Sequence, residues 1–158
     1  MSLDCTTPRG QVYIAHQMGC LDRLNKAWKV QIITTDGSDM ADVDAVAVRD
    51  NCVSAVMEVK SREMDLAQLR RFGSYLITFE KLLKLRAVAA ALRVPGLVVV
   101  SLLKDQTTVF WKICDREGGL LVGLESKVSR TQATCNGGSV DRYNAYLSLE
   151  DMQVIPAT

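Results

Sequence analysis

Two short runs decide the fold. They are Ala41-Asp42-Val43-Asp44-Ala45-Val46-Ala47-Val48 and, after a polar turn, Val53-Ser54-Ala55-Val56-Met57-Glu58-Val59-Lys60. Both are rich in Val and Ala and too short for stable helices, so we expect two neighbouring strands. The turn between them is Arg49-Asp50-Asn51. The pattern therefore predicts a β-hairpin.

Three charged side chains interrupt this apolar hairpin: Asp44, Glu58 and Lys60. An unpaired buried charge is costly, so a structural hairpin has little reason to carry them. Carboxylates bind hard divalent cations, and an ammonium can steady an attacking water or a phosphate oxygen. The three residues together indicate a metal-dependent nuclease centre.

The spacing of these residues makes a geometric demand. Glu58 and Lys60 are two apart on one strand, so both side chains leave the same face. A regular hairpin with a two-residue Asp50-Asn51 turn would pair Asp44 with Met57 and point Asp44 to the other face. A three-residue loop, or one β-bulge, would place Asp44 opposite Glu58. We therefore expect a bulge or an odd-length loop.

The composition is that of an ordinary globular protein. The chain has 158 residues, enough to bury a real core, and we expect residues 1–158 to form a single domain. Hydrophobic residues make up 48% and the net charge is +1. Nucleic acid would therefore have to be met by a local basic patch, because bulk basicity is absent.

The cysteines argue against a zinc site and a disulfide framework, because their number is odd and no CxxC pair occurs. They are Cys5, Cys20, Cys52, Cys114 and Cys135, and the one histidine is His16. His16 is either a structural helix residue or a catalytic group. No signal pattern and no membrane-spanning apolar run occurs in the sequence. We expect a cytoplasmic protein with no membrane partner.

Two helical regions flank the hairpin. The first runs from Gln11 to about Lys26, with Thr7 and Pro8 at its start and apolar residues at a 3.6-residue period. The second runs from Leu66 to about Arg93, and its length of nearly 30 residues predicts a break near Gly73 or before Ala87.

The remaining elements are predicted strands and turns. A β-branched and aromatic run predicts a strand at residues 28–35, and Asp36–Asp39 is a turn. Further strands are expected at 97–103, 107–114, 120–124 and 129–134, with a loop at 136–139 and a strand or short helix at 143–149. The strand after the second helix should lie parallel to the strand before it. The fold class is therefore α/β, a central mixed sheet flanked by helices.

The spacing Asp-x13-Glu-x-Lys, together with this element order, resembles the PD-(D/E)XK superfamily of restriction-endonuclease-like nucleases. The resemblance covers roughly residues 8–113, as motif and element order. It implies a restriction-endonuclease-like αβββαβ core. It also implies that Asp44 and Glu58 are metal-binding carboxylates, that the Val59 carbonyl is a further ligand and that Lys60 is the catalytic lysine. The cofactor implied is Mg²⁺ or Mn²⁺.

Two positions depart from that family's pattern. Many members carry an acidic residue in the first helix, often after Gly, whereas Gln11 follows Gly10 here. A carboxamide is a poorer cation ligand than a carboxylate, so Gln11 is an accessory candidate. Val43 stands before Asp44 in place of Pro.

A second acid-x-Lys triplet, Glu125-Ser126-Lys127, tests how specific the motif is. Its nearest upstream acids fall in a Gly-rich turn and no long helix follows it, so context favours Glu58 and Lys60. The alternative for the Glu58 motif is a solvated edge hairpin with a surface ion pair.

Candidates for nucleic-acid contact are Arg62, Gln68 and Arg71. Gln68, one turn into the second helix, either points back at the site or is solvated. The basic residues form either a phosphate-tracking patch or an ordinary charged helix face; they are Arg62, Arg70, Arg71, Lys81 and Lys84. Asp42 is either a second metal ligand or a strand-end acid.

We expect a Mg²⁺-dependent deoxyribonuclease that hydrolyses DNA phosphodiester bonds, of phage, mobile-element or repair type, with a homodimer as the candidate oligomer. The alternative, which Gln11 favours, is a catalytically silent nucleic-acid-binding module that keeps the fold. A third alternative is RNA as the substrate.

Overall fold

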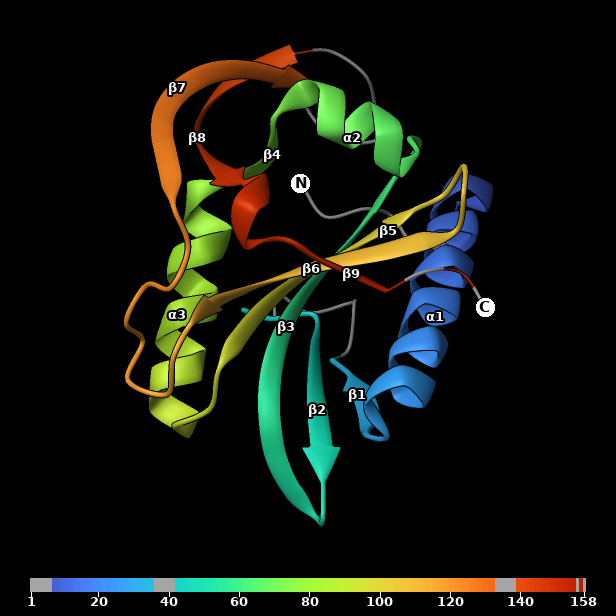
Figure 1. The fold of residues 1–158 in the computed structure, drawn as a ribbon, viewed down its shortest axis with the longest axis vertical. Coiled ribbons are helices and arrows are strands. Elements are labelled where there is room, and N and C mark those ends of the chain that lie inside the picture. The colour runs from blue at the N-terminus through green and yellow to red at the C-terminus, as the bar shows by residue number, and fades with distance from the viewer. Residues whose placement is uncertain (1–6, 36–41, 133–138, 156, 158) are drawn as a thin grey trace.

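The computed structural model describes residues 7–35, 42–132, 139–155 and 157, which fold into helices and strands in two sheets (Figure 1). The helices are α1 (Pro8–Trp28), α2 (Leu66–Phe72), α3 (Phe79–Leu92) and the 3-10 turn η1 (Leu149–Asp151). The strands are β1 (Gln31–Thr34), β2 (Ala45–Arg49), β3 (Cys52–Arg62), β4 (Ser74–Thr78), β5 (Gly96–Leu102), β6 (Thr107–Cys114), β7 (Leu124–Gln132), β8 (Ser139–Ser148) and β9 (Gln153–Ile155).

The larger sheet has the strand order β1-β2-β3-β5-β6-β9. β3 and β5 run parallel, as the sequence predicted, whereas the other neighbouring pairs of this sheet are antiparallel. In chain order α1, β1, β2, β3, α3 and β5 follow the predicted αβββαβ core, with α2 and β4 inserted before α3. The predicted fold class is therefore confirmed.

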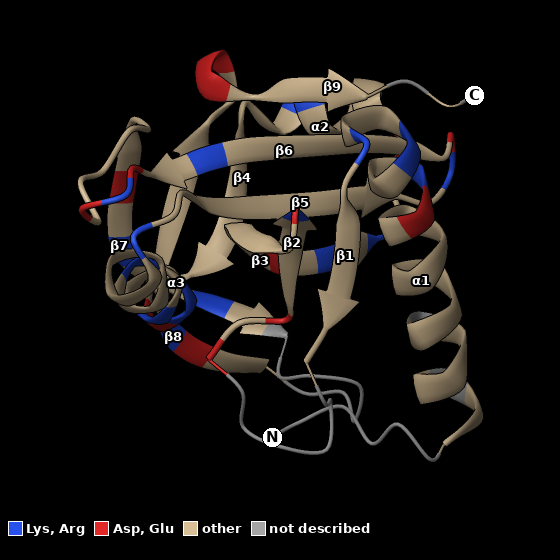
Figure 2. Cartoon of the chain, turned by 90° about the horizontal axis from the view of Figure 1, so that it is seen from below, with Lys and Arg blue, Asp and Glu red and all other residues tan. Residues whose placement is uncertain are grey.

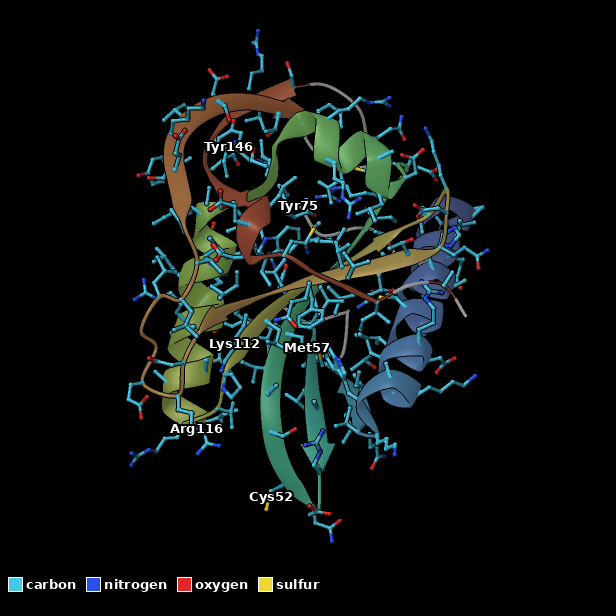
Figure 3. The ribbon with its side chains drawn as sticks, viewed as in Figure 1. Cys52, Met57, Tyr75, Lys112, Arg116 and Tyr146 are labelled. Atoms are coloured by element: carbon cyan, nitrogen blue, oxygen red, sulfur yellow. The ribbon has the colours of Figure 1, made fainter. Side chains whose placement is uncertain are left out.

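A helix covers each face of this sheet (Figures 1 and 2). On one face, Leu21 and Leu24 of α1 pack against Met57 and Val59 of β3 in one buried cluster. On the other face, Leu82 and Leu85 of α3 lie in a second cluster that includes Val56. Alternate β3 residues thus point to opposite cores, as the period of a strand requires. Figure 3 shows Met57 near the middle of the molecule and Cys52 at the far hairpin tip.

The β2–β3 hairpin contains the bulge that the sequence demanded. Its turn has two residues, Asp50 and Asn51, both with positive φ, as a type I′ turn requires. Near the turn Val48 pairs with Val53, but farther along Ala47 pairs with Ala55, so Ser54 is the extra residue. This shift continues to the Ala45–Met57 pair and puts Asp44 opposite Glu58.

The start of α1 follows its sequence signals. Thr7 is the N-cap, and its hydroxyl accepts a 3.1 Å hydrogen bond from the Gly10 amide. The helix continues to Trp28, two residues beyond the predicted end, so the first strand begins at Gln31. Trp28 therefore belongs to α1 and contacts Phe110 of β6 edge to face.

The second predicted helical region forms two helices with a strand between them. α2 ends at Gly73, whose left-handed φ of 76° provides the C-cap, so the predicted break near Gly73 is confirmed. The structure then forms β4 over Ser74–Thr78, where the sequence predicted continued helix. Tyr75 and Ile77 of β4 are buried, and pairing with β8 overrides the helical pattern that Leu76 and Phe79 suggested.

A second sheet, with the order β4-β8-β7, lies beyond the α3 face of the larger sheet. Tyr75 stacks on Trp111 of β6 at 5.2 Å between ring centroids, which joins the two sheets through one core. The predicted strand at 120–124 is wrong, since Leu120 makes only an isolated bridge to Cys114. The predicted 129–134 strand is confirmed over residues 129–132, which form the end of β7, and residues 133–134 lie outside the described part of the chain.

The last predicted element forms part of β8, which runs from Ser139 to Ser148. The predicted turn at 36–39 and most of the predicted loop at 136–139 lie outside the described residues. None of the described helices is long and apolar enough to cross a membrane.

Candidate functional site

The structure brings together Asp44, which directly precedes β2, and Glu58 and Lys60 in the second half of β3. Lys60 Nζ lies 2.5 Å from Glu58 Oε1 and 3.6 Å from Asp44 Oδ2. Both carboxylates therefore share one ammonium, and all three side chains lie on the α3 side of the larger sheet. The geometry that the motif spacing required is present.

Glu58 is fully buried. Burial is the largest influence on the pKa of Glu58 and raises it; Lys60 opposes this rise, and the Asp44 carboxylate adds to it. Its Oε1 atom is occupied by lysines, but its Oε2 atom has no hydrogen-bond partner among the described residues. A buried carboxylate oxygen without a partner is energetically costly, so this atom is available to accept a contact from a bound group.

Lys60 stays an ammonium in this environment. Burial lowers the pKa of Lys60, but the carboxylates of Glu58 and Asp44 outweigh that effect and hold the pKa above its ordinary value. A permanently charged lysine can orient or stabilise an anionic oxygen. It is poorly suited to accept a proton.

Lys81 of α3, predicted to belong either to a phosphate-tracking patch or to a charged helix face, contacts the carboxylate site itself. Its Nζ lies 3.4 Å from Glu58 Oε1. Nothing in the sequence directed Lys81 toward the hairpin, because β4, which sets where α3 begins, was not predicted. With Lys81 present, two ammonium groups offset the charges of Asp44 and Glu58.

The main chain of Val59 faces the same place. Its N–H donates a 2.8 Å hydrogen bond to Asp44 Oδ2. Successive residues of β3 direct their backbone groups to opposite sides of the strand. The Val56 N–H donates to the Pro95 carbonyl on the β5 side, whereas the Met57 carbonyl accepts from the Asp44 N–H on the β2 side. The Val59 carbonyl therefore also points to the Asp44 side, as expected for the further metal ligand.

These donors fit a hard divalent cation. Mg²⁺ binds through one or two carboxylates and keeps several waters, so two carboxylates and a carbonyl suffice. No cluster of three or more His, Cys, Asp or Glu side chains suited to a metal occurs in the part of the chain that the structure describes. Asp44 Oδ2, Glu58 Oε2 and the Val59 carbonyl are thus the donor set available.

Tyr75 of β4 borders the site and was not anticipated. Its ring stands 5.6 Å from the Arg62 guanidinium, and its buried hydroxyl has no partner among the described residues. Burial raises the pKa of Tyr75, while the charges of Arg62 and Lys60 oppose the rise. The sequence signal that could have located Tyr75 is the run after Gly73, Ser74-Tyr75-Leu76-Ile77-Thr78, whose aromatic and β-branched residues favour a strand.

The predicted nucleic-acid contacts have separate surroundings. Arg62 donates to the Ser61 carbonyl and stacks on Tyr75, beside the site. Gln68 belongs to the capping box of α2: its side-chain oxygen accepts hydrogen bonds from the Asp65 amide and from Lys104, both at 3.0 Å. Arg71 is exposed in the last turn of α2.

Three other candidates lie in exposed positions. Gln11 and His16 are exposed residues of α1. Asp42 pairs with Lys84 at 3.7 Å, and its side chain is 56% exposed, so it is a strand-end acid bound by α3. Glu125 and Lys127 of the second acid-x-Lys triplet are exposed on β7, and Lys127 lies over the Tyr146 ring. The structure therefore separates the two triplets by burial.

In the view of Figure 2, lysine and arginine positions of the described residues are spread over several elements and lie among aspartate and glutamate positions. Lys84 of the predicted basic patch is paired with both Glu80 and Asp42. Basic groups near the site are Lys60, Lys81 and Arg62. Part of the basic patch predicted along the helix is therefore neutralised by ion pairs with acidic residues.

Comparison with known proteins gives a weak structural likeness. No family model matches this sequence, and no curated protein matches it. A 1.6 Å structure of Hjc, a Holliday junction resolvase from the archaeal hyperthermophile Archaeoglobus fulgidus, superimposes with a TM-score of 0.46 and 16% sequence identity. The match covers 82% of this chain and 87% of that one.

Proposed function

We propose that this chain is a divalent-metal-dependent nuclease that hydrolyses phosphodiester bonds in DNA. The observation that carries the proposal is the convergence of Asp44 and Glu58 on Lys60, with Glu58 Oε2 buried and without a partner among the described residues. A structural ion pair has no need of a second buried carboxylate oxygen left unsatisfied. A phosphate-cleaving centre needs it as a cation ligand.

Asp44, Glu58 and the Val59 carbonyl would hold Mg²⁺ or Mn²⁺. The cation would supply Lewis-acid stabilisation of the charge that develops on the phosphate during hydrolysis. The Val59 amide fixes the Asp44 carboxylate by its 2.8 Å hydrogen bond, so this ligand is oriented before any cation binds.

Lys60 orients the nucleophile or stabilises a phosphate oxygen. Its ammonium is held between the two carboxylates, within 4 Å of each. A charge preorganised in a poorly solvated site interacts with an anion more strongly than the same charge in water. Lys81 reaches Glu58 from the other side and keeps the carboxylate pair neutralised when the cation is absent.

The decisive experiment incubates the protein with linear, circular and branched DNA in Mg²⁺ or Mn²⁺. We expect metal-dependent cleavage that Lys60→Ala lowers by about 10²-fold or more. The matched control is Lys127→Ala, which changes the lysine of the exposed acid-x-Lys triplet and should leave the rate unchanged. The proposal fails if no DNA form is cut and Glu58→Ala leaves Mn²⁺ binding as it was.

A catalytically silent nucleic-acid-binding module is the second candidate. The observation in its favour is that Lys60 and Lys81 already neutralise both carboxylates, while Gln11 stands where the resemblance expects an acid. Salt-sensitive DNA binding without metal-dependent turnover would select this candidate. Comparing cleavage of DNA with cleavage of RNA tests the remaining substrate alternative.

A further inference from the structure

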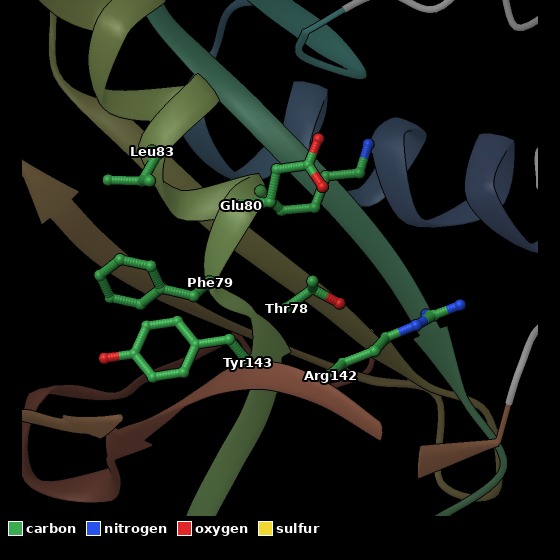
Figure 4. Close-up of a pocket in the computed structure, with 7 residues that line it drawn as sticks. Thr78, Phe79, Glu80, Leu83, Arg142 and Tyr143 are labelled. Carbon is green, nitrogen blue, oxygen red and sulfur yellow. The ribbon is translucent and has the colours of Figure 1, made fainter. Parts of the chain in front are cut away.

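An open pocket lies where α3 leaves β4 and passes the middle of β8 (Figure 4). Its volume is about 540 Å³, within the range of small-ligand sites. It is lined by Thr78, Phe79, Glu80, Lys81, Leu83, Arg142 and Tyr143. Lys81 also contacts Glu58, so the pocket adjoins the carboxylate site directly.

One wall of the pocket is apolar and aromatic. The rings of Phe79 and Tyr143 meet edge to face, with centroids 4.8 Å apart. Tyr143 is 48% exposed, and so is Leu83 beside it. Figure 4 shows these three side chains on one side of the pocket, with Thr78 and Arg142 on the other. Phe79 is half-buried, so Tyr143 is the exposed ring of this wall, and an accessible aromatic ring beside a cation is what an unstacked base binds.

The polar wall carries excess positive charge. Glu80, the acid of the lining, is already paired with Lys84 at 3.1 Å. No described residue provides a carboxylate or hydrogen-bond acceptor for the guanidinium of Arg142, a half-buried residue. The neighbouring acid on β8, Asp141, pairs with Arg130 instead. Within the described ranges, Arg142 is thus a cation without a counter-ion at the edge of a pocket.

We infer that this pocket binds one unstacked nucleotide of the substrate strand, next to the phosphate that the carboxylate site would cut. The base would lie against Phe79 and Tyr143, and its phosphate would contact Arg142. A base inside a duplex is covered by its neighbours, so the substrate class is DNA that is single-stranded or locally unpaired beside the cut. This inference rests on the proposed function and specifies its substrate.

The test measures binding in EDTA, where no cleavage occurs. Fluorescence anisotropy gives the affinity of a labelled oligo-dT strand and of a duplex of equal length. We expect Arg142→Ala and Tyr143→Ala each to weaken single-strand binding about 10-fold, and duplex binding far less. Arg142→Ala should also reduce the slope of the logarithm of the binding constant against the logarithm of the salt concentration by about one.

The matched control is Arg130→Ala, which removes another arginine of the same small sheet and should leave single-strand affinity unchanged. Arg142→Lys and Tyr143→Phe restore the charge and the ring and should recover most of the binding, which separates the contact from a folding defect. Equal effects of Arg142→Ala and Arg130→Ala, or equal losses for single strand and duplex, would overturn the inference.

The two proposals fail in different ways. If the protein cleaves DNA in a metal-dependent way but the pocket variants bind single-stranded DNA like wild type, the nucleotide subsite is refuted and the nuclease proposal stands. If the pocket variants lose single-strand binding but the protein cleaves no DNA, the nucleotide subsite stands and the nuclease proposal is refuted.

Discussion

The Val59 amide donates a 2.8 Å hydrogen bond to Oδ2 of Asp44. β2 begins only at Ala45. Beyond this end of the strand, the Asp44 carboxylate replaces a backbone carbonyl as the acceptor for the next N–H of β3. The contact fixes Asp44 by main-chain geometry and keeps it within 3.6 Å of the Lys60 ammonium. The site is therefore an extension of the sheet, and its integrity depends on hairpin register.

Deleting Ser54 should preserve the site. Ser54 is the bulged residue, and without it a regular hairpin with the same two-residue turn still places Asp44 opposite Glu58. Mn²⁺ affinity, measured by calorimetry, should stay within about threefold of wild type, a difference of less than 1 kcal/mol. Ser54→Ala, which keeps the length but loses the 3.2 Å bond to Ala47, is the control. A folded deletion variant without Mn²⁺ binding would show that the bulge itself shapes the site.

Lys81→Met should tighten metal binding. The Lys81 ammonium occupies Glu58 Oε1 at 3.4 Å and competes with a cation for the same carboxylate. Because the lysine side chain is 36% exposed, the gain should not exceed about 1 kcal/mol, or roughly fivefold in Mn²⁺ affinity. Lys84→Met is the matched control, since Lys84 pairs with Glu80 and Asp42. Weaker Mn²⁺ binding by Lys81→Met alone would contradict the competition.

Glu58→Gln should raise the free energy of unfolding near neutral pH by about 1 kcal/mol while abolishing cleavage. Burial raises the pKa of Glu58 in the folded state, despite the opposing charge of Lys60. The stability contribution of a group with a raised pKa is present below its unfolded-state value and is lost as the pH rises through the folded-state value. The advantage of the variant should therefore shrink on acidification.

Urea unfolding of wild type and Glu58→Gln between pH 4 and pH 8, as approximate limits, measures this difference. Glu125→Gln, at an exposed position of β7, supplies the control for removing one carboxylate. If the stabilities of wild type and Glu58→Gln differed by the same amount at every pH, Glu58 would not titrate differently on folding.

Gly73→Ala should destabilise the fold by about 1 kcal/mol and lower Tm by about 2–4 °C. Gly73 has a φ of 76°, and an added Cβ would meet nothing within 4 Å, so the cost is purely one of backbone conformation. Gly123→Ala is the control, because its backbone lies outside the left-handed region and its nearest contact would be an ordinary 3.6 Å. Equal Tm values for the two variants would refute the role of Gly73.

Much of the core followed from local pattern. The apolar runs of β3 and β5 predicted buried strands, and Thr7 with Pro8 located the start of α1. The prediction that the Glu58 and Lys60 side chains point to the same face of the sheet followed from their spacing of two residues along a strand. The β4 strand escaped prediction because Leu76 and Phe79 continue the apolar helical stripe of the region before them, and the pairing of β4 with β8 depends on residues about 70 positions away.

The sequence by itself determined the hairpin, the parallel β3–β5 pair and the requirement for a bulge, because strand periodicity and turn chemistry are local properties. Only the tertiary structure decided that Lys81 reaches Glu58, that Glu58 is fully buried and that Arg142 borders an aromatic pocket. Each of these depends on how α3 and the second sheet pack against β3. Such packing joins residues far apart in the chain, which no local periodicity encodes.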